Sequence, residues 1–144
     1  MAHEFRWIQQ VQFSDTDMAG IVHFSNFFRY MENTEHAFFR SLGFSIHTRI
    51  GDTTVGWPRV RATCEYKAPL RFEDEFEILL TVREKKLRSL TYDFSFTKLT
   101  GELVATGTLT AVCVTLDEPT GRMKAAKIPE EITAVIEAAP VVDA

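Results

Sequence analysis

The chain has only two cysteines, no long apolar run and no excess of positive charge. The cysteines, Cys64 and Cys113, each stand in a strand-like alternating run, and we expect small buried hydrophobes in a reducing cytoplasm. No apolar run approaches the roughly 20 residues that a membrane span requires. The N-terminal residues also lack the apolar segment and cleavage site of a signal peptide. We therefore expect a cytoplasmic protein that is not inserted in a membrane.

The charge balance and the histidines exclude two further classes of partner. A formal net charge of -4 argues against non-specific nucleic-acid binding, which needs a basic surface. The four histidines show no metal-ligand spacing and the cysteines form no Cys-x-x-Cys pair, so we expect neither a metal nor a cofactor. Because the 144 residues contain no repeat and no linker, the sequence predicts one domain over residues 1–144.

One long helix is predicted after a first strand over residues 4–13. Ser25 is a candidate N-cap, and Gly43 suits the position just beyond the C-terminus of the helix. Apolar residues recur at helical spacing along this segment, namely Phe24, Phe27, Phe28, Met31, Phe38 and Leu42.

Alternating apolar runs after the helix predict consecutive antiparallel strands. Three runs begin at Val60, Phe76 and Leu90, and a long fourth run extends from Leu103 to Leu116. Residues 45–57 resemble a loop, Pro129 is expected to open a short helix, and the tail after about residue 139 is expected to be disordered. One strand, a long helix and then consecutive antiparallel strands predict an α+β fold.

Residues 13–31 are the most informative stretch for function. Asp15 and Asp17 lie two residues apart, directly before a predicted turn at Gly20 and an aromatic-rich helix. This order brings an acid close to a helix N-terminus, where free backbone N–H groups can receive developing negative charge. An acyl-transfer site needs both a carboxylate that acts as base or nucleophile and a donor for the oxyanion.

The pattern Asp15-x-Asp17-x-x-Gly20 resembles the motif that opens hotdog-fold thioesterases of the 4-hydroxybenzoyl-CoA thioesterase family. Further matching segments follow in order at residues 57–60, 66–74, 88–92, 105–107, 121–122 and 128–129. The resemblance thus covers nearly the whole chain. It implies a hotdog fold, in which a curved antiparallel sheet wraps around one long helix.

The same resemblance implies a thioester hydrolase without a cofactor. In the family, the acid at the position of Asp17 attacks the thioester carbonyl or activates a water, and the sequence does not choose between these roles. The oxyanion donors would be backbone N–H groups near His23 and Phe24. The expected substrate is an aryl- or short- to medium-chain acyl-CoA. An acyl-carrier-protein thioesterase and a non-catalytic acyl-CoA-binding module stay open as alternatives, whereas nothing matches the histidine site of a hotdog dehydratase.

Other residues of the motif have expected supporting roles. Asp15 is expected to hydrogen-bond the turn and hold Asp17 in place, and Asn26 to tie the helix to the loop. Gly20 is expected to supply either a positive φ or close approach of the substrate to the backbone. Many relatives carry Tyr-His where this chain has His23 followed by Phe24, so a catalytic role of that histidine cannot be transferred.

Glu35 is the second candidate for the catalytic acid. At 100° per residue it falls between Met31 and Phe38 on the apolar face of the helix. A carboxylate there is costly unless it is paired or hydrogen-bonded. A second clade of hotdog thioesterases places its acid on this helix, but its opening pattern differs. We therefore expect a buried structural acid, satisfied by a loop or by a partner subunit.

A basic cluster before a predicted turn is a candidate for binding CoA phosphates. The cluster consists of Arg83, Lys85, Lys86 and Arg88. Arg88 and Ser89 are the preferred CoA-binding residues because the motif match includes them, and a solvated strand face is the alternative for each basic residue. An exposed sheet edge favours pairing between subunits, so we expect a homodimer that assembles into a homotetramer.

Overall fold

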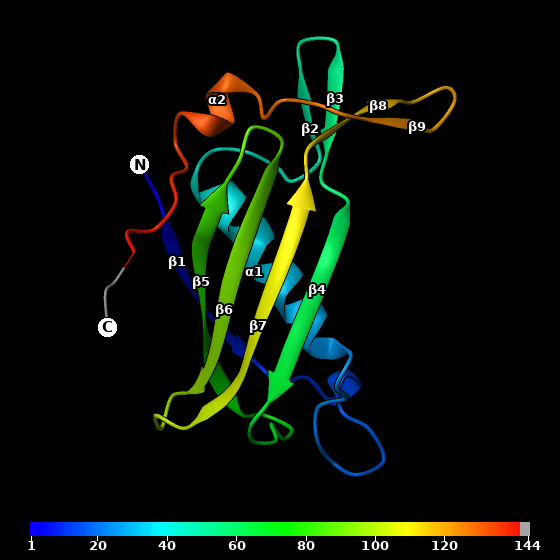
Figure 1. The fold of residues 1–144 in the computed structure, drawn as a ribbon. Helices are drawn as coiled ribbons and strands as arrows, with labels where there is room; N and C mark the ends of the chain where they lie inside the picture. Colours follow the sequence, from blue (N-terminus) through cyan, green and yellow to red (C-terminus); the bar gives the residue numbers. More distant parts are fainter. Residues whose placement is uncertain (142–144) are drawn as a thin grey trace.

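The computed structural model describes residues 1–141 and contains two antiparallel sheets and one long helix (Figure 1). The elements in chain order are β1 (Glu4–Gln10), α1 (Asn26–Ser41), β2 (Thr48–Ile50), β3 (Thr53–Gly56), β4 (Arg59–Tyr66), β5 (Glu75–Lys85), β6 (Ser89–Lys98), β7 (Leu103–Val112), β8 (Val114–Asp117), β9 (Arg122–Ala125) and α2 (Glu130–Thr133). Part of the tail that was expected to be disordered, residues 142–144, lies outside the described residues. Within residues 1–141, no helix is long and apolar enough to cross a membrane.

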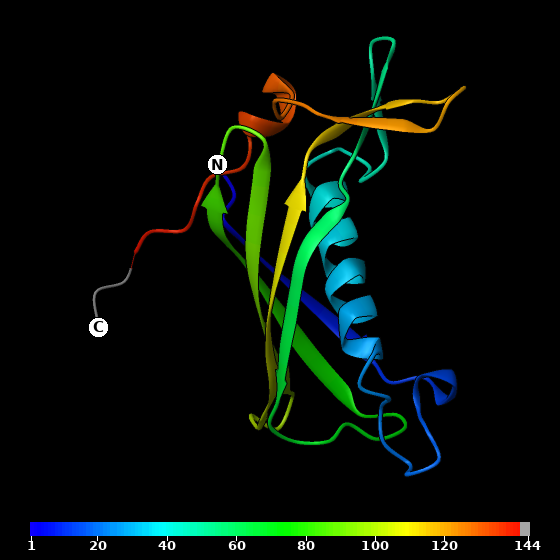
Figure 2. The same cartoon turned by 45° about the vertical axis from the view of Figure 1, so that its right-hand side comes forward.

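The large sheet has the strand order β1-β5-β6-β7-β4 and curves around α1 (Figure 2). All neighbouring strands in it are antiparallel. The alternation predicted along the central strands is confirmed, because the residues that face α1 are buried: Phe76, Ile78, Leu80 and Val82 on β5, and Leu90, Tyr92, Phe94 and Phe96 on β6. The α+β fold is therefore confirmed, and its core lies between this sheet and the helix.

Helix α1 begins and ends close to the predicted residues, but its start is not capped as expected. Gly43 has a φ of 90°, and the N–H of Phe44 after it donates to the Phe39 carbonyl at 2.9 Å, which closes the C-terminus. Ser25 precedes the helix in an α-helical conformation, and its hydroxyl makes no capping hydrogen bond. The Ser25 hydroxyl instead lies 2.8 Å from Nδ1 of His23.

Two predictions about the strands were wrong. Residues 45–57 contain β2 and β3, which join β8 and β9 in a second sheet of order β2-β3-β8-β9. β3 pairs with its neighbour β2 on one side and with β8, far away in the sequence, on the other. Because the pairing with β8 depends on a distant segment, the local pattern does not reveal this sheet. The long run from Leu103 to Leu116 is divided at the buried Cys113, whose N–H donates to the Arg88 carbonyl at 2.8 Å. As a result β7 and β8 belong to different sheets.

The first strand is also shorter than predicted. β1 ends at Gln10, and Phe13–Asp15 form a 3-10 turn. Asp15 and Gln12 close this turn, because the Gln12 N–H donates to Oδ2 of Asp15 at 2.9 Å. The chain therefore leaves the sheet edge three residues earlier than the predicted end at residue 13. The turned chain places Asp15 beside the start of α1 instead of extending the strand.

Candidate active site

A mainly apolar pocket of about 530 Å³ lies where the loop before α1 meets the end of β4. It is lined by Asp17, Ile21, Val22, Phe24, Phe27, Tyr66, Lys67, Ala68, Pro69 and Leu70. Among these lining residues, Asp17 carries a carboxylate and Lys67 carries a positive charge. A small number of polar groups in an apolar, concave surface is the usual composition of a small-molecule site.

The loop closes on itself and sets the direction of Asp17. The Asp17 N–H donates to the Ile21 carbonyl at 2.9 Å, and the Gly20 N–H donates to the Asp17 carbonyl at 3.0 Å. Gly20 has a φ of 79°, so of the two roles expected for it the positive φ is observed. Oδ1 of Asp17 accepts from the Ala19 N–H at 2.9 Å. Oδ2 accepts no hydrogen bond from residues 1–141 and is available for chemistry at the pocket.

Of the two backbone N–H groups suggested as oxyanion donors, the structure leaves one free. The His23 N–H donates to the Asp15 carbonyl at 2.9 Å, so it is not available to a substrate. The Phe24 N–H, in contrast, donates to no acceptor among the described residues, and Phe24 lines the pocket. The His23 ring packs against that of Phe24 with centroids 4.6 Å apart and the planes tilted by 31°, and its Nδ1 accepts from the Ser25 N–H at 3.3 Å.

Asp15 does not hydrogen-bond to the Asp17 side chain but fixes the base of the loop. Its Oδ2 accepts from the Tyr30 hydroxyl at 2.9 Å, and its carbonyl accepts from the Asn26 side chain at 2.8 Å. Asn26 therefore joins the helix to the loop, as its position suggested. Burial and the neighbouring Asp15 carboxylate raise the pKa of Tyr30 far above its usual range. The phenol consequently stays protonated and donates to Asp15.

Tyr66 lines the pocket, although the sequence analysis did not assign it to the site. Its hydroxyl donates to the Phe24 carbonyl at 2.9 Å, and its ring meets that of Phe27 edge-on with centroids 5.1 Å apart. Burial, with a smaller effect of Cys64, raises the pKa of Tyr66 to about 12. The signals in the sequence were the position of Tyr66 at the end of an alternating run and at the start of the matching segment 66–74, and neither assigned it to the pocket. Its contact with the start of α1 depends on how the strand and helix pack.

Glu35 lies outside this pocket and is paired within its own chain. Its side chain is fully buried, and its carboxylate receives two contacts from Arg59, Nη2 to Oε1 at 2.5 Å and Nη1 to Oε2 at 3.2 Å. Burial raises the pKa of Glu35, and Arg59 opposes that rise. We expected a loop or a second subunit to satisfy Glu35. That prediction was wrong, because the partner is Arg59, the first residue of β4 in the same chain.

Arg88 and Ser89 lie at the turn between β5 and β6, at the opposite end of the large sheet from the Asp17 loop (Figures 1 and 2). The rest of the basic cluster is engaged: Arg83 with Asp93, Lys85 with the carbonyls of Thr133 and Ile136, and Lys86 with Glu84. Arg88 is exposed, and its guanidinium makes no ion pair with residues 1–141. Within one chain, the structure does not bring Arg88 and Ser89 to Asp17.

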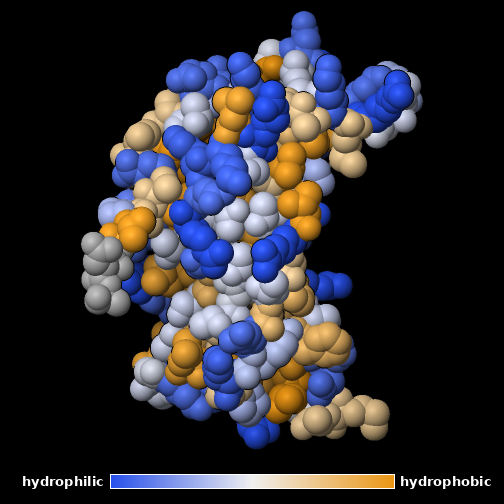
Figure 3. Space-filling view, in the orientation of Figure 1, coloured by the Kyte–Doolittle hydropathy of each residue, from blue (hydrophilic) through white to orange (hydrophobic). Residues whose placement is uncertain are grey.

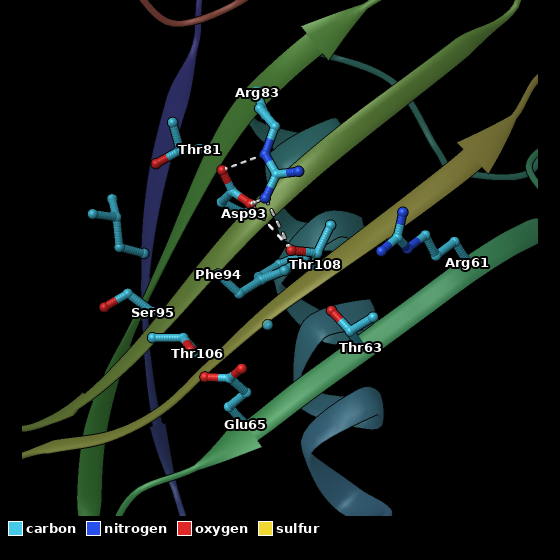
Figure 4. A pocket seen from close by; sticks show the side chains of 12 residues that line it. Arg61, Thr63, Glu65, Thr81, Arg83, Asp93, Phe94, Ser95, Thr106 and Thr108 are labelled. Atoms are coloured by element: carbon cyan, nitrogen blue, oxygen red, sulfur yellow. Dashed lines mark hydrogen bonds and ion pairs between the residues drawn. The ribbon is translucent and has the colours of Figure 1, made fainter. Parts of the chain in front are cut away.

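A second hollow, of about 600 Å³, lies on the face of the large sheet turned away from α1. Hydrophilic and near-neutral residues mix on this side of the molecule (Figure 3). Figure 4 shows that Arg83 reaches Asp93, and its Nη2 also donates to the Thr108 hydroxyl at 3.2 Å. Arg83 and Asp93 thus pair with each other, and the hollow is also lined by Arg61 and by Glu65, whose Oε2 lies 3.3 Å from Nζ of Lys67. Among the described residues, no group of three or more His, Cys, Asp or Glu could hold a metal ion.

A curved antiparallel sheet wrapped around one long helix defines a hotdog fold. The chain belongs to the Thioesterase-like superfamily, whose family model matches residues 11–136. The resemblance in the opening motif and the expected class, a thioester hydrolase, are thereby confirmed.

Individual relatives cover almost the whole chain. A curated protein of Aquifex aeolicus is 34% identical over 132 residues, which is 92% of this chain and 97% of that protein. The acyl-CoA thioester hydrolase YbgC of Escherichia coli is 27% identical over 130 residues, or 90% of this chain and 93% of YbgC. The solved structure of a gentisyl-coenzyme A thioesterase has a TM-score of 0.75 at 30% identity, covering 90% of this chain and 99% of that chain.

Proposed function

We propose that the protein hydrolyses the thioester of an aryl- or short- to medium-chain acyl-CoA to the free acid and CoA. Membership of the superfamily supports thioester hydrolysis, and two of the relatives have names that specify CoA thioesters. The observation that supports the proposal most strongly is that Asp17 and Phe24 line the same apolar pocket. A carboxylate with a free oxygen and a free N–H there are the two groups that acyl transfer needs.

In this proposal Asp17 is either a general base or a nucleophile. As a base it takes a proton from a water whose oxygen bonds to the thioester carbonyl carbon; the C–S bond then breaks and CoA leaves as a thiolate. As a nucleophile its own oxygen forms that bond, and water hydrolyses the resulting anhydride. Both routes place negative charge on the carbonyl oxygen, where the Phe24 N–H donates to it. Because a thiolate is a good leaving group, one carboxylate and one donor suffice.

The pocket is half of a site that a second copy of the chain completes. β4 lies at an edge of the large sheet, and within residues 1–141 it pairs only with β7. Val60 and Tyr66 on this strand are 63% and 45% exposed. An unpaired edge with exposed apolar side chains favours pairing with another strand. We therefore propose a homodimer through β4 that assembles further into a homotetramer.

Antiparallel pairing of two β4 strands also explains how a basic turn distant from Asp17 can serve the site. A two-fold axis at the strand pair places the second copy's β5–β6 turn at the end of the assembly where the first copy's loop lies. Arg88 and Ser89 of the second copy would then be close to the Asp17 pocket. In this proposal they bind the phosphates of CoA, which an exposed guanidinium recognises through charge-assisted hydrogen bonds.

A thiol-release assay tests the proposed function directly. The purified protein is incubated with a panel of acyl-CoAs, aryl and aliphatic, and with matched acyl-carrier-protein thioesters, and the released thiol is detected. We expect turnover of acyl-CoAs with a preference within the panel. Turnover restricted to carrier-protein thioesters would identify the alternative thioesterase. Binding of acyl-CoA without thiol release would identify a binding module and contradict the proposal.

A further inference from the structure

The core contains a tyrosine whose ring is enclosed and whose hydroxyl reaches the loop that carries Asp17. Tyr30 is 1% exposed, and its ring centroid lies 5.9 Å from that of Phe27 and 5.0 Å from that of Phe76. A phenylalanine would fill the same space, so packing does not account for the hydroxyl. The hydroxyl donates to Oδ2 of Asp15 at 2.9 Å.

Asp15 is a junction in the loop before α1, because hydrogen bonds connect it to residues from the start and the end of that loop. Its side chain also accepts from the Gln12 N–H at 2.9 Å. Its carbonyl accepts from the His23 N–H at 2.9 Å and from the Asn26 side chain at 2.8 Å. Gln12 after β1, His23 in the returning part of the loop and Asn26, the first residue of α1, thus all donate to Asp15.

Both reactive groups of the proposed site are attached close to this junction. Asp17 follows Asp15 by two residues, and Phe24 follows His23 by one. Met18, at the tip of the loop, is fully exposed, so packing does not hold the tip. A shift of Asp15 therefore changes the separation between the Asp17 carboxylate and the Phe24 N–H.

We infer that Tyr30 is a positioning residue for the thioesterase reaction: its hydroxyl holds Asp15, and through Asp15 it fixes Asp17 relative to the Phe24 N–H. The inference rests on the proposed function of that pocket. A buried hydroxyl without an acceptor is unfavourable, so the phenol and the carboxylate hold each other in place. A displacement of about 1 Å between reacting groups can cost about 100-fold in rate.

The test is the Tyr30→Phe variant, with Tyr92→Phe as the matched control. Tyr92 is also fully buried against α1, but its hydroxyl faces Glu35 and not the loop. We expect Tyr30→Phe to lower kcat for acyl-CoA hydrolysis by about 10- to 100-fold while KM stays within about two-fold. Tyr92→Phe should change neither constant. The thermal midpoints of both variants are measured alongside. A purely structural role of Tyr30 would lower the midpoint without lowering kcat at constant KM.

Asp15→Ala provides a second route to the same answer, because Ala has no side-chain oxygen to accept from the Tyr30 hydroxyl or from the Gln12 N–H. It should lower kcat at least as much as Tyr30→Phe does, and the double variant should be no slower than Asp15→Ala, since the Tyr30 hydroxyl has then already lost its acceptor. If Tyr30→Phe does not fold, Asp15→Ala decides: a lowered kcat supports the inference and a normal kcat overturns it. A normal kcat in the soluble variant, or an equal loss in Tyr92→Phe, would overturn the inference.

Failure of the inference can be separated from failure of the proposed function by including Asp17→Asn in the same assay. An Asp17→Asn variant as active as the wild type would remove the proposed catalytic site itself. An inactive Asp17→Asn variant together with a fully active Tyr30→Phe variant would leave the site intact and remove only the positioning role of Tyr30.

Discussion

Glu35 and Arg59 form a two-point ion pair that joins the buried face of α1 to the first residue of β4, with nitrogen–oxygen distances of 2.5 and 3.2 Å. Arg59 also lies 3.5 Å from Glu32, whose side chain is half exposed. Because a buried carboxylate is tolerated only when it is paired, Arg59 accounts for an acid on the apolar face of the helix. The pair therefore supports a structural role for Glu35 over a catalytic one.

The first prediction separates these two roles. Replacing Glu35 by Gln should lower the free energy of unfolding by about 3 kcal/mol, the low end for breaking a buried pair, because Glu32 still faces Arg59. The kcat of the folded variant should stay near that of the wild type. Denaturant unfolding and a thiol-release assay measure the two effects. A stable Glu35→Gln protein without activity would transfer the catalytic role to Glu35.

The second prediction concerns the subunit contact through β4. Val60→Glu places a charge on this edge strand and should convert the assembly to monomers with little thioesterase activity. Ile8→Glu is the matched control, because Ile8 is 57% exposed on β1, the other edge strand of the same sheet. It should change neither assembly nor activity. Sedimentation velocity at assay concentration measures the mass, and an active wild-type monomer would contradict the proposed dimer.

The third prediction tests the CoA-binding turn. Arg88→Ala and Ser89→Ala should raise KM for acyl-CoA several-fold and leave kcat largely intact, the pattern of binding that is equal in ground and transition states. The effect of Arg88→Ala should shrink as salt is raised from 0.1 M to 1 M, because the Debye length falls from about 10 Å to about 3 Å.

Thioester substrates that lack the nucleotide are the control for this turn. They should be indifferent to both substitutions, since the phosphates that Arg88 and Ser89 would bind are missing. Equal losses with full-length and shortened substrates would mean that the two residues support the fold and do not hold the nucleotide.

The elements with a strong local pattern were predictable from sequence. The runs that begin at Phe76 and Leu90 alternate between apolar and polar residues, and this alternation indicates one buried face. Gly43 marks the end of α1 because its φ is positive. Asp17 was identified because the acid, the glycine turn and the helix start follow each other closely along the chain. Local order of this kind is visible without knowing how the chain packs.

What the sequence could not reveal depends on contacts between distant segments. Arg59 is the partner of Glu35 across 24 residues, and the Tyr66 hydroxyl reaches the Phe24 carbonyl across 42. The choice of Phe24 over His23 as oxyanion donor rests on the acceptor that His23 finds at Asp15. Neither residue type nor spacing encodes which backbone N–H groups remain free after the loop has folded.

The measurement that tests the central claim most directly is single-turnover thiol release by Asp17→Asn. Asn keeps the size of the side chain and removes the charge that attacks or activates water, so we expect a loss of at least about 100-fold in rate with little change in substrate binding. Asp52→Asn makes the same chemical change at an exposed turn and should retain full activity. Near-normal release by Asp17→Asn would contradict the assignment of Asp17 as the catalytic carboxylate.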